Sequence, residues 1–313
     1  MKKFYYAPME GITGHIYRNV HNDLFKNNID KYFSPFVVAN QSKSLKTKEL
    51  IDILPENNQG IALVPQILTN NAKDFINTAK KMKYLGYDEI NLNLGCPSGT
   101  VVSKNRGSGF LSKRKELDEF LEEIFSEPVT KISIKTRLGK DNPEEFYELI
   151  KIFNKYPMEE LIIHPRTQKD FYGNEPNLKV FKDALSLSKN TVCYNGDIFT
   201  VEAYEKFTEN FKSVQTIMLG RGLLANPELV RNIINGTKLN KETLKEFHDR
   251  IYEEYKKYLS GDIYVLHKMK ELWFYMLKMF YDGENYAKRI RMCDNFKDYE
   301  AAVLCLFRER EFI

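Results

Sequence analysis

Short runs of apolar residues recur along the first two thirds of the chain, and longer stretches with helical spacing separate most of them. Several runs are apolar almost throughout, which is typical of parallel strands that are buried on both faces. The pattern predicts eight strands, at residues 4–7, 32–38, 61–68, 89–94, 131–137, 161–165, 191–195 and 216–219. It predicts helices between them, among others at residues 71–85, 115–125, 143–156 and 201–210.

The alternation of strands and helices is compatible with two α/β folds. Eight such units within residues 1–240 match the length of a (β/α)8 barrel, the TIM barrel. A doubly wound open sheet would carry a glycine-rich GxGxxG turn after its first strand. This chain continues there with Pro8-Met9-Glu10-Gly11, which does not fit that turn. We therefore predict a TIM barrel for residues 1–240.

The pattern changes near Thr243. Residues 241–313 keep helical spacing to the end, and 15 of these 73 residues are Phe, Trp or Tyr. No stretch rich in glycine, serine or proline precedes them, so we expect them to pack rigidly on the barrel. The predicted fold is thus an α/β TIM barrel followed by a small all-helical C-terminal domain at residues 241–313.

Composition and charge limit the function further. With 42% hydrophobic and 29% charged residues, the chain has the composition of an ordinary globular protein. Its 47 basic and 43 acidic residues give a net charge of +4, which permits a nucleic-acid partner without requiring one. Its four cysteines include no CxxC pair, which argues against a disulfide framework and a structural zinc site. The sequence shows neither a membrane-length apolar stretch nor a signal peptide, and its cysteine usage suits a reducing compartment, so we expect a cytoplasmic protein. We also expect a monomer without a metal ion.

Polar and ionisable residues gather where the predicted strands end. In a TIM barrel these positions face the active site. We call them the rim: Pro8, Met9, Gln66, Asn93, Cys96, Lys135, Arg137, His164, Arg166, Asn195, Gly196, Asp197, Gly220 and Arg221. Core packing explains few of these residue types, so the rim is the candidate site.

Cys96 follows a strand directly, in Asn93-Leu94-Gly95-Cys96-Pro97, where glycine and proline favour a tight turn. It could act as a nucleophile or as a general acid, and an ordinary thiol with a pKa near ~8.5 is mostly protonated at neutral pH. Burial as a small hydrophobic side chain is the alternative for any free cysteine. We expect that fate for Cys193, Cys293 and Cys305.

Two glycine-containing turns predict a phosphate site. Gly220-Arg221-Gly222 ends the eighth strand, where barrels often bind phosphate through backbone N–H groups. Asn195-Gly196-Asp197 supplies further donors after the seventh strand. Lys135 is hard to explain as a core residue, whereas His164 could be one. A cation at Lys135 would stabilise the anion of a reduced flavin.

Seven motifs, in the same order along the chain, resemble those of the tRNA-dihydrouridine synthases. They are Ala7-Pro8-Met9-Glu10-Gly11-Ile12-Thr13, Ile90-Asn91-Leu92-Asn93-Leu94-Gly95-Cys96-Pro97 with Gly107-Ser108, Lys135-Thr136-Arg137, His164-Pro165-Arg166-Thr167, Tyr172-Gly173, Asn195-Gly196-Asp197-Ile198 and Gly220-Arg221-Gly222. Two positions depart from the family pattern: Gly14 stands where aspartate is common, and Asn177 where tryptophan is common. These departures concern RNA docking or subfamily rather than the cofactor.

The resemblance implies an FMN enzyme that reduces the C5–C6 double bond of specific uridines in tRNA. NADPH would reduce the flavin and leave, reduced FMN would deliver hydride to C6, and Cys96 would protonate C5. The residues implied for FMN are Pro8, Met9, Gln66, Lys135, His164, Asn195, Gly196, Asp197, Gly220 and Arg221. Those expected to contact the substrate are Asn93, Arg137, Arg166, Lys104 and Arg106. The target base must leave the folded RNA to reach the flavin.

The sequence leaves three other functions open. An FMN barrel that acts on a small molecule, as in dihydroorotate dehydrogenase, would share the phosphate site but would not need the helical tail. The same uridine chemistry could act on ribosomal RNA. A non-catalytic RNA-binding protein is the third alternative, although an intact rim speaks against it. The tail balances 14 basic against 14 acidic residues, so local patches such as Lys268, Lys270, Lys288, Arg289 and Arg291 would have to meet the RNA.

Overall fold

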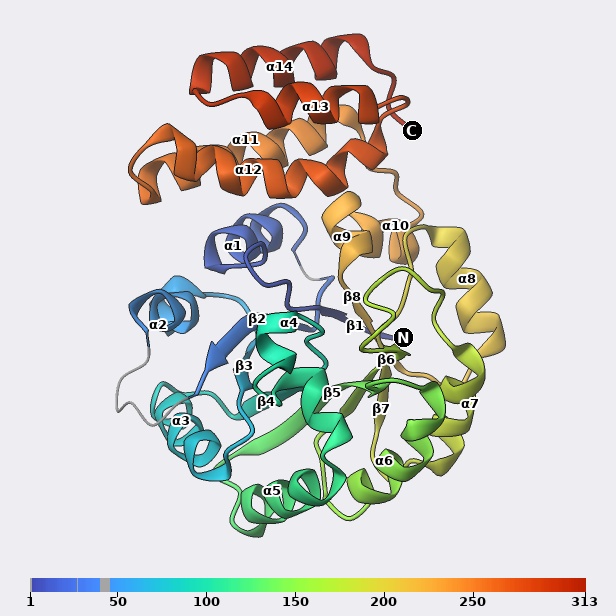
Figure 1. Cartoon of the computed structure of the whole chain (residues 1–313). Coiled ribbons are helices and arrows are strands. Elements are labelled where there is room, and N and C mark those ends of the chain that lie inside the picture. The colour runs from blue at the N-terminus through green and yellow to red at the C-terminus, as the bar shows by residue number, and fades with distance from the viewer. Residues whose placement is uncertain (1, 27, 40–45) are drawn as a thin grey trace. The chain divides into compact units, whose positions relative to one another are not determined.

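The computed structural model describes residues 2–26, 28–39 and 46–313. Eight parallel strands close into a barrel in chain order, which confirms the predicted TIM barrel (Figure 1). The strands are β1 Lys3–Tyr6, β2 Lys31–Val38, β3 Leu63–Leu68, β4 Glu89–Leu94, β5 Lys131–Gly139, β6 Leu161–Thr167, β7 Val192–Tyr194 and β8 Thr216–Leu219. Each overlaps one of the eight predicted runs, because buried parallel strands are recognisable as continuous apolar segments.

Helices connect and follow the strands. The longer ones are α1 His15–Leu24, α2 Thr47–Ile53, α3 Ala72–Tyr84, α5 Arg114–Ser126, α6 Phe146–Phe153, α7 Leu178–Leu187, α8 Val201–Asn210, α10 Leu229–Asn235, α11 Lys241–Tyr258, α12 Asp262–Met276, α13 Glu284–Met292 and α14 Phe296–Glu309. Short turns of helix are α4 Gly99–Val102, α9 Arg221–Ala225, η1 Pro55–Asn57, η2 Gly107–Ser112, η3 Pro143–Glu145 and η4 Leu277–Met279.

The helix predicted at residues 143–156 shows how local sequence sets an element. It forms as η3 and α6 in succession. Glu145 accepts hydrogen bonds at Oε1 from the backbone N–H groups of Asp141 and Asn142, 2.8 Å each. The Asn142 side chain in turn accepts from the backbone N–H of Glu145, which completes a capping box. Such reciprocal capping satisfies donors that have no partner inside the helix. The segment therefore begins at Pro143, as its sequence predicts.

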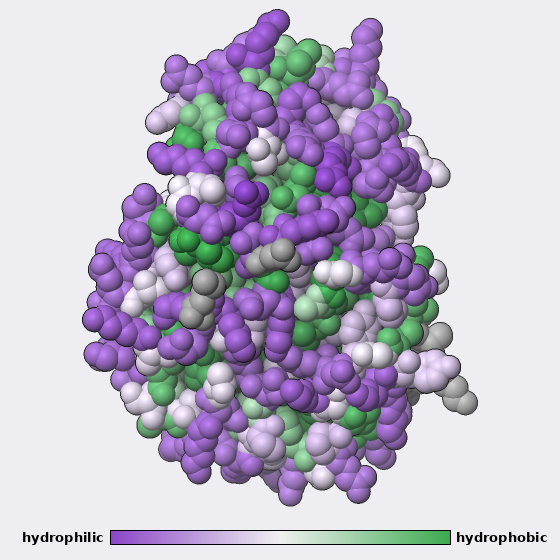
Figure 2. Space-filling model, turned by 180° about the vertical axis from the view of Figure 1, so that it is seen from behind, coloured by the Kyte–Doolittle hydropathy of each residue, from purple (hydrophilic) through white to green (hydrophobic). Residues whose placement is uncertain are grey.

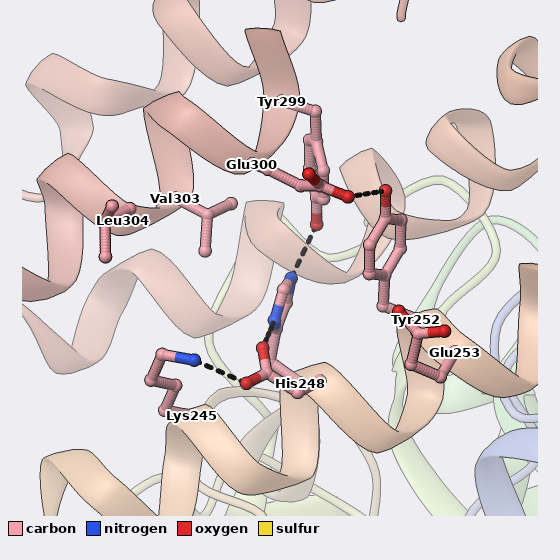
Figure 3. A pocket seen from close by; sticks show the side chains of 9 residues that line it. Lys245, His248, Tyr252, Glu253, Tyr299, Glu300, Val303 and Leu304 are labelled. Atoms are coloured by element: carbon pink, nitrogen blue, oxygen red, sulfur yellow. Dashed lines mark hydrogen bonds and ion pairs between the residues drawn. The ribbon is translucent and has the colours of Figure 1, made fainter. Parts of the chain in front are cut away.

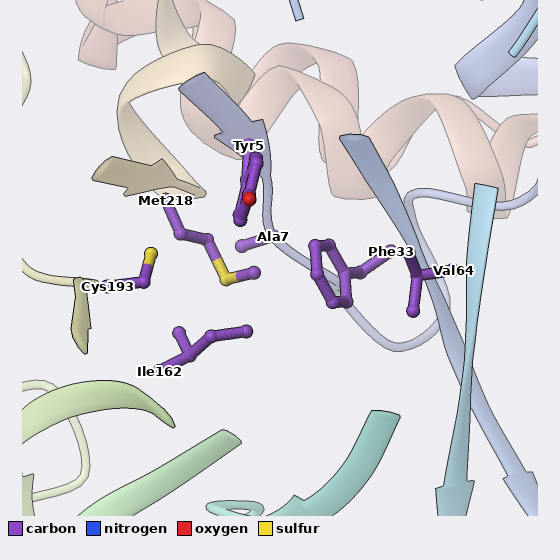
Figure 4. Close-up of a cluster of buried hydrophobic side chains, with 7 residues drawn as sticks. All are labelled: Tyr5, Ala7, Phe33, Val64, Ile162, Cys193 and Met218. Carbon is purple, nitrogen blue, oxygen red and sulfur yellow. The ribbon is translucent and has the colours of Figure 1, made fainter. Parts of the chain in front are cut away.

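A cluster of apolar side chains lies in the interior of the barrel (Figure 4). The cluster comprises Tyr5, Ala7, Phe33, Val64, Ile162, Cys193 and Met218. All of them are buried, and Cys193 is fully buried, as expected for a cysteine inside a strand. The barrel is therefore a packed core, and the chemistry has to lie where its strands end.

The chain divides into two compact units. One comprises Met1–Pro8, Asp30–Asp197 and Thr208–Leu219 and contains all eight strands. The other comprises Met9–Ile29, Ile198–Phe207 and Gly220–Ile313. The second unit thus holds the helical tail together with α1, α9 and α10. The division of function at residue 240 stays a prediction.

Within the second unit, α1 packs against the first helix of the tail. The rings of Tyr17 and Phe247 meet edge to face, with centroids 5.5 Å apart. Arg250 forms an ion pair with Asp23 at 3.1 Å. The tail's first helix therefore has its packing partner near the beginning of the sequence.

The helical tail contains a buried polar cluster between α11 and α14 (Figure 3). His248 lies between Tyr299, 2.6 Å from its Nε2, and Asp249, 2.8 Å from its Nδ1. The indole N–H of Trp273 donates to the same Tyr299 hydroxyl at 2.8 Å. Burial lowers the pKa of His248. Most tail rings are buried, so aromatic richness here marks a helical core.

On the face that Figure 2 shows, hydrophilic side chains predominate and hydrophobic ones form small separate areas. In the part of the chain that the structure describes, no helix is long and apolar enough to cross a membrane.

Candidate active site at the carboxyl ends of the strands

The loop that carries Cys96 is fixed by hydrogen bonds on both sides. The side-chain oxygen of Asn93, at the end of β4, accepts from the backbone N–H groups of Gly95 (3.0 Å) and Cys96 (2.9 Å). The Cys96 carbonyl accepts from the backbone N–H of Ser108 (3.1 Å) and from its hydroxyl (2.8 Å). Cys96 is partly exposed, unlike Cys193 in the barrel core. These bonds hold the backbone of the loop at Cys96 in place.

The backbone at position 107, close to the Cys96 loop, requires a glycine. Its φ is +55°, in the left-handed region. A Cβ at this position would lie 2.8 Å from the Cys96 carbonyl oxygen and 3.1 Å from the Cys96 Cβ. Only a residue without a side chain fits such an approach without strain. The motif Gly107-Ser108 thus packs directly against the cysteine loop.

A chain of buried amides supports Asn93 from inside the barrel. Asn93 donates to Gln66 (2.7 Å), Gln66 donates to Asn91 (2.7 Å), and Asn91 donates to the hydroxyl of Ser133 (2.9 Å). Gln66, Asn91 and Ser133 are fully buried. Sequence reasoning missed Asn91 and Ser133. Both could have been recognised in the sequence as polar residues on the inward-facing side of an otherwise apolar strand.

Lys135 is a largely buried cation beside this loop. In the β4–β5 register it lies opposite Asn93. Burial lowers the pKa of Lys135 to about 8, and the nearby positive charge of Arg137 contributes in the same direction. Among the described residues, no carboxylate forms an ion pair with its ammonium group. A buried cation without a counterion is costly by itself, so this position suits an anionic ligand.

Arg137 is buried and bonds to backbone carbonyls. Its Nε donates to Gly95 (2.9 Å) and its Nη1 donates to Thr167 (2.7 Å), and it lies over the ring of Tyr172 at 5.4 Å. These contacts tie the cysteine loop to the end of β6. Sequence reasoning placed Arg137 at the substrate, and the structure adds this positioning of the loop.

At the end of β6, Arg166 brings two further rim residues together. Its Nη1 lies 3.0 Å from His164 Nε2, and its two terminal nitrogens bond both carboxylate oxygens of Asp197 at 3.0 and 2.5 Å. His164 and Arg166 are both buried. The ring of Tyr172 lies 6.0 Å from that of His164. The sequence placed these residues at one rim but did not predict that they bond to one another.

The remaining rim residues fall in both units. Asn195 is buried and donates to the Met218 carbonyl at 2.8 Å, while Pro8 and Gly196 are partly exposed in the same unit. Met9, Gly220 and Arg221 belong to the second unit. There the backbone N–H of Met9 bonds to the Thr13 hydroxyl at 2.8 Å, and the Arg221 guanidinium lies 5.5 Å from the Phe199 ring. Their shared role in phosphate binding stays a prediction.

Lys104 and Arg106 lie in the segment between Cys96 and η2. Lys104 is exposed, and its carbonyl accepts from the Asn70 side chain at 3.2 Å. Arg106 is partly exposed and contacts the same Asn70 side chain at 3.4 Å. Lys104 therefore carries an exposed charge close in sequence to Cys96, and Arg106 a partly exposed one.

No group of three or more metal-ligating side chains occurs in residues 2–26, 28–39 and 46–313. The donors at the rim are instead amides, one buried ammonium, guanidinium groups and an imidazole. This set suits hydrogen bonding to a polar, anionic organic ligand. The residues present therefore fit a flavin mononucleotide, whose phosphate and ring oxygens are acceptors.

Comparison with known proteins agrees with the resemblance found in the sequence motifs. The family model described as "Dihydrouridine synthase (Dus)" matches residues 5–309. The chain is 28% identical over 300 residues to a tRNA-dihydrouridine(16) synthase of Pasteurella multocida, with 92% of this chain and 94% of that protein covered. It is 30% identical over 232 residues to the tRNA-dihydrouridine(16) synthase of Pseudomonas putida, covering 71% and 70% of the two proteins.

Solved structures support the fold alone. Morphinone reductase in complex with tetrahydroNAD aligns with a TM-score of 0.51 at 12% identity, over 76% of this chain and 88% of that one. The old yellow enzyme from Trypanosoma cruzi aligns with a TM-score of 0.54 at 10% identity, over 82% and 94%. Together with the match over nearly its whole length, the motifs and the barrel show that this chain belongs to the dihydrouridine synthase family.

Proposed function

We propose that this protein reduces the C5–C6 double bond of specific uridines in tRNA to dihydrouridine, with FMN as its bound cofactor and NADPH as the hydride source. The observation that carries the proposal is the fixed Cys96 loop at the end of β4, next to Lys135, which forms no ion pair with a carboxylate of the described residues. The family match and relatives named as tRNA-dihydrouridine synthases support the substrate.

FMN, when bound, would supply the hydride that saturates C6. The residues proposed to hold it are Pro8, Met9, Gln66, Lys135, His164, Asn195, Gly196, Asp197, Gly220 and Arg221. Lys135 would supply the positive charge that an electron-rich ring or phosphate requires. The structure adds that the Asp197 side chain bonds to Arg166, so Asp197 would act on the cofactor mainly by holding that arginine.

Cys96 would hold the proton that C5 receives. Saturation of the double bond needs one hydride at C6 and one proton at C5, so a donor has to lie on the uridine side. The thiol is partly exposed, and its loop is held by Asn93, Ser108 and Gly107. Such preorganisation is what general acid catalysis requires.

RNA would be bound by charges outside the buried rim. Asn93, Arg137 and Arg166 use most of their polar atoms within the protein, so their part in substrate binding would be to shape the site around the base. Lys104 and Arg106 are available for phosphates. We assign catalysis to the barrel of residues 1–240 and further RNA contacts to residues 241–313. An extruded base needs such backbone contacts to hold the RNA in place.

Mapping dihydrouridine in RNA from a deletion strain tests the proposal. We expect one or a few tRNA positions to lose the modification, the wild-type gene to restore them, and a Cys96→Ala gene to fail. The purified protein should be yellow and release FMN on denaturation. Loss of dihydrouridine confined to ribosomal RNA would show that the substrate is ribosomal RNA and not tRNA. A colourless protein that takes up no FMN would contradict the proposal.

A further inference from the structure

Arg166 is enclosed by partners on every side. Its side chain is 2% exposed. Nε donates to the Asn174 carbonyl at 2.5 Å, and both terminal nitrogens bond Asp197 in a two-pronged contact. Paired, parallel bonds of this kind fix the plane of a guanidinium group. Its remaining contact, Nη1 to His164 Nε2 at 3.0 Å, is therefore made by a group that cannot rotate away.

That contact sets the chemistry of the His164 ring. A guanidinium has only donors, so His164 Nε2 has to accept. In a neutral ring the proton then lies on Nδ1. A protonated ring would bring two N–H donors and two positive charges together at 3.0 Å. Arg137, opposite His164 in the β5–β6 register, adds a further positive charge on this side.

We propose that Arg166 is a positioning residue, which holds His164 as a neutral ring with its proton on Nδ1, so that a ligand contacting this nitrogen meets a hydrogen-bond donor. The bonded atom of the ligand is then an acceptor, such as a carbonyl or phosphate oxygen. This inference rests on the proposed function, in which His164 contacts the cofactor.

The same geometry gives His164 and Cys96 different chemical roles. A neutral imidazole is a very weak acid, because its N–H proton can leave only to form an anion. His164 in this state cannot be the source of the proton at C5. Asp197 takes part indirectly, because its carboxylate holds the guanidinium that faces the ring.

Nitrogen-15 NMR of histidine-labelled protein tests the proposal. The chain has five histidines, and His164→Asn assigns the signal of interest. We expect the coupling pattern of a neutral ring protonated at Nδ1 in the protein as purified at neutral pH. In Arg166→Met, whose side chain has similar length but no donor, we expect a mixture of tautomers. Arg231→Met is the matched control, since Arg231 also pairs with a carboxylate, Glu228, at 3.3 Å.

Uridine reduction is measured on the same variants. Arg166→Met should lower it by about ten- to a hundredfold, the loss found when outer partners of metal-bound histidines are removed. If Arg166→Met does not fold, Asp197→Asn keeps the shape and should loosen the tautomer in part. A wild-type ring protonated at Nε2 or on both nitrogens overturns the proposal, as does an unchanged ring in Arg166→Met. If wild-type protein shows the expected ring but makes no dihydrouridine, the proposed function fails while the tautomer assignment stands.

Discussion

The barrel rim and the helical tail each bury a histidine in a polar cluster, but the two clusters differ in how their charges are balanced. In the tail, His248 has one partner on each ring nitrogen, Asp249 and Tyr299. At the rim, Lys135 has no carboxylate partner among the described residues, and its pKa is lowered to about 8. A satisfied network stabilises a fold, whereas a buried cation without a counterion costs stability unless a ligand compensates it. This difference favours the rim as the ligand site and a structural role for the tail cluster.

Replacing the thiol at the rim should give the largest effect. Cys96→Ala is expected to lower uridine reduction by about 10²- to 10⁴-fold, the contribution typical of a general acid. FMN binding and flavin reduction by NADPH should stay unchanged, because neither needs a proton at C5. Cys305→Ala, in the tail, is the control. Equal slowing of flavin reduction in single-turnover measurements would contradict the role of Cys96.

Moving the same thiol without removing it should cost less. Gly107→Ala forces a left-handed residue and an approach of 2.8 Å to the Cys96 carbonyl. A displacement of this kind can lower turnover by about 10²-fold. Gly60→Ala is the matched control, because Gly60 also has a positive φ, +73°, with nothing within 4 Å of the added Cβ. Similar turnover in both variants would show that the Cys96 position does not matter.

The charge of Lys135 predicts a pH dependence of FMN affinity. Lys135 is charged below its pKa of about 8 and neutral above it, so binding of the anionic cofactor should weaken as pH rises. The dissociation constant should increase by at most about tenfold per pH unit between roughly pH 8 and 9.5. Titration of apoprotein followed by flavin fluorescence measures this change. Lys135→Met should bind FMN weakly at every pH in this range. If the pH dependence of FMN affinity persists in this variant, another group causes it.

The tail cluster should affect stability and leave the cofactor alone. His248→Leu removes one partner of the buried Tyr299 hydroxyl, which should lower the free energy of unfolding by about 1–3 kcal/mol. FMN affinity should not change. Denaturation in urea measures the loss. A change in FMN affinity without a change in stability would mean that the tail cluster is part of the site.

The sequence was sufficient for the barrel, whereas the roles of the rim residues stay predictions. Buried parallel strands are visible as apolar runs, and residues after their ends share one face by the geometry of the fold. Pairings among side chains were not predictable. Arg166 and Asp197 are 31 residues apart, and nothing in either motif shows that one holds the other. The packing of α1 on α11 was missed for the same reason, since helical spacing gives an apolar face but no partner.

Removing charges from the tail surface should give the smallest effect. These variants test which part of the tail binds RNA. A cavity of about 350 Å³ lies between α11 and α14, and its lining includes Asp249, Glu253 and Glu300 with a single cation, Lys245. Carboxylates repel phosphates, so this cavity is a poor RNA surface. Lys268 and Lys270, which the sequence suggested, are half-buried and donate to the carbonyls of Gly11 and Cys293.

The exposed cations of α13 are better placed to bind RNA: Lys288, Arg289 and Arg291. Replacing all three by alanine should weaken tRNA binding modestly and reduce its salt dependence, by about one unit of log–log slope for each phosphate that is no longer neutralised. A triple alanine variant at the exposed Lys115, Lys151 and Lys182 removes equal charge from α5, α6 and α7 as a control. If both triple variants change the slope equally, only net charge matters. If neither does, RNA binding belongs to Lys104 and Arg106 beside the cysteine loop, and the comparison of rim and tail would then assign both chemistry and RNA binding to the barrel.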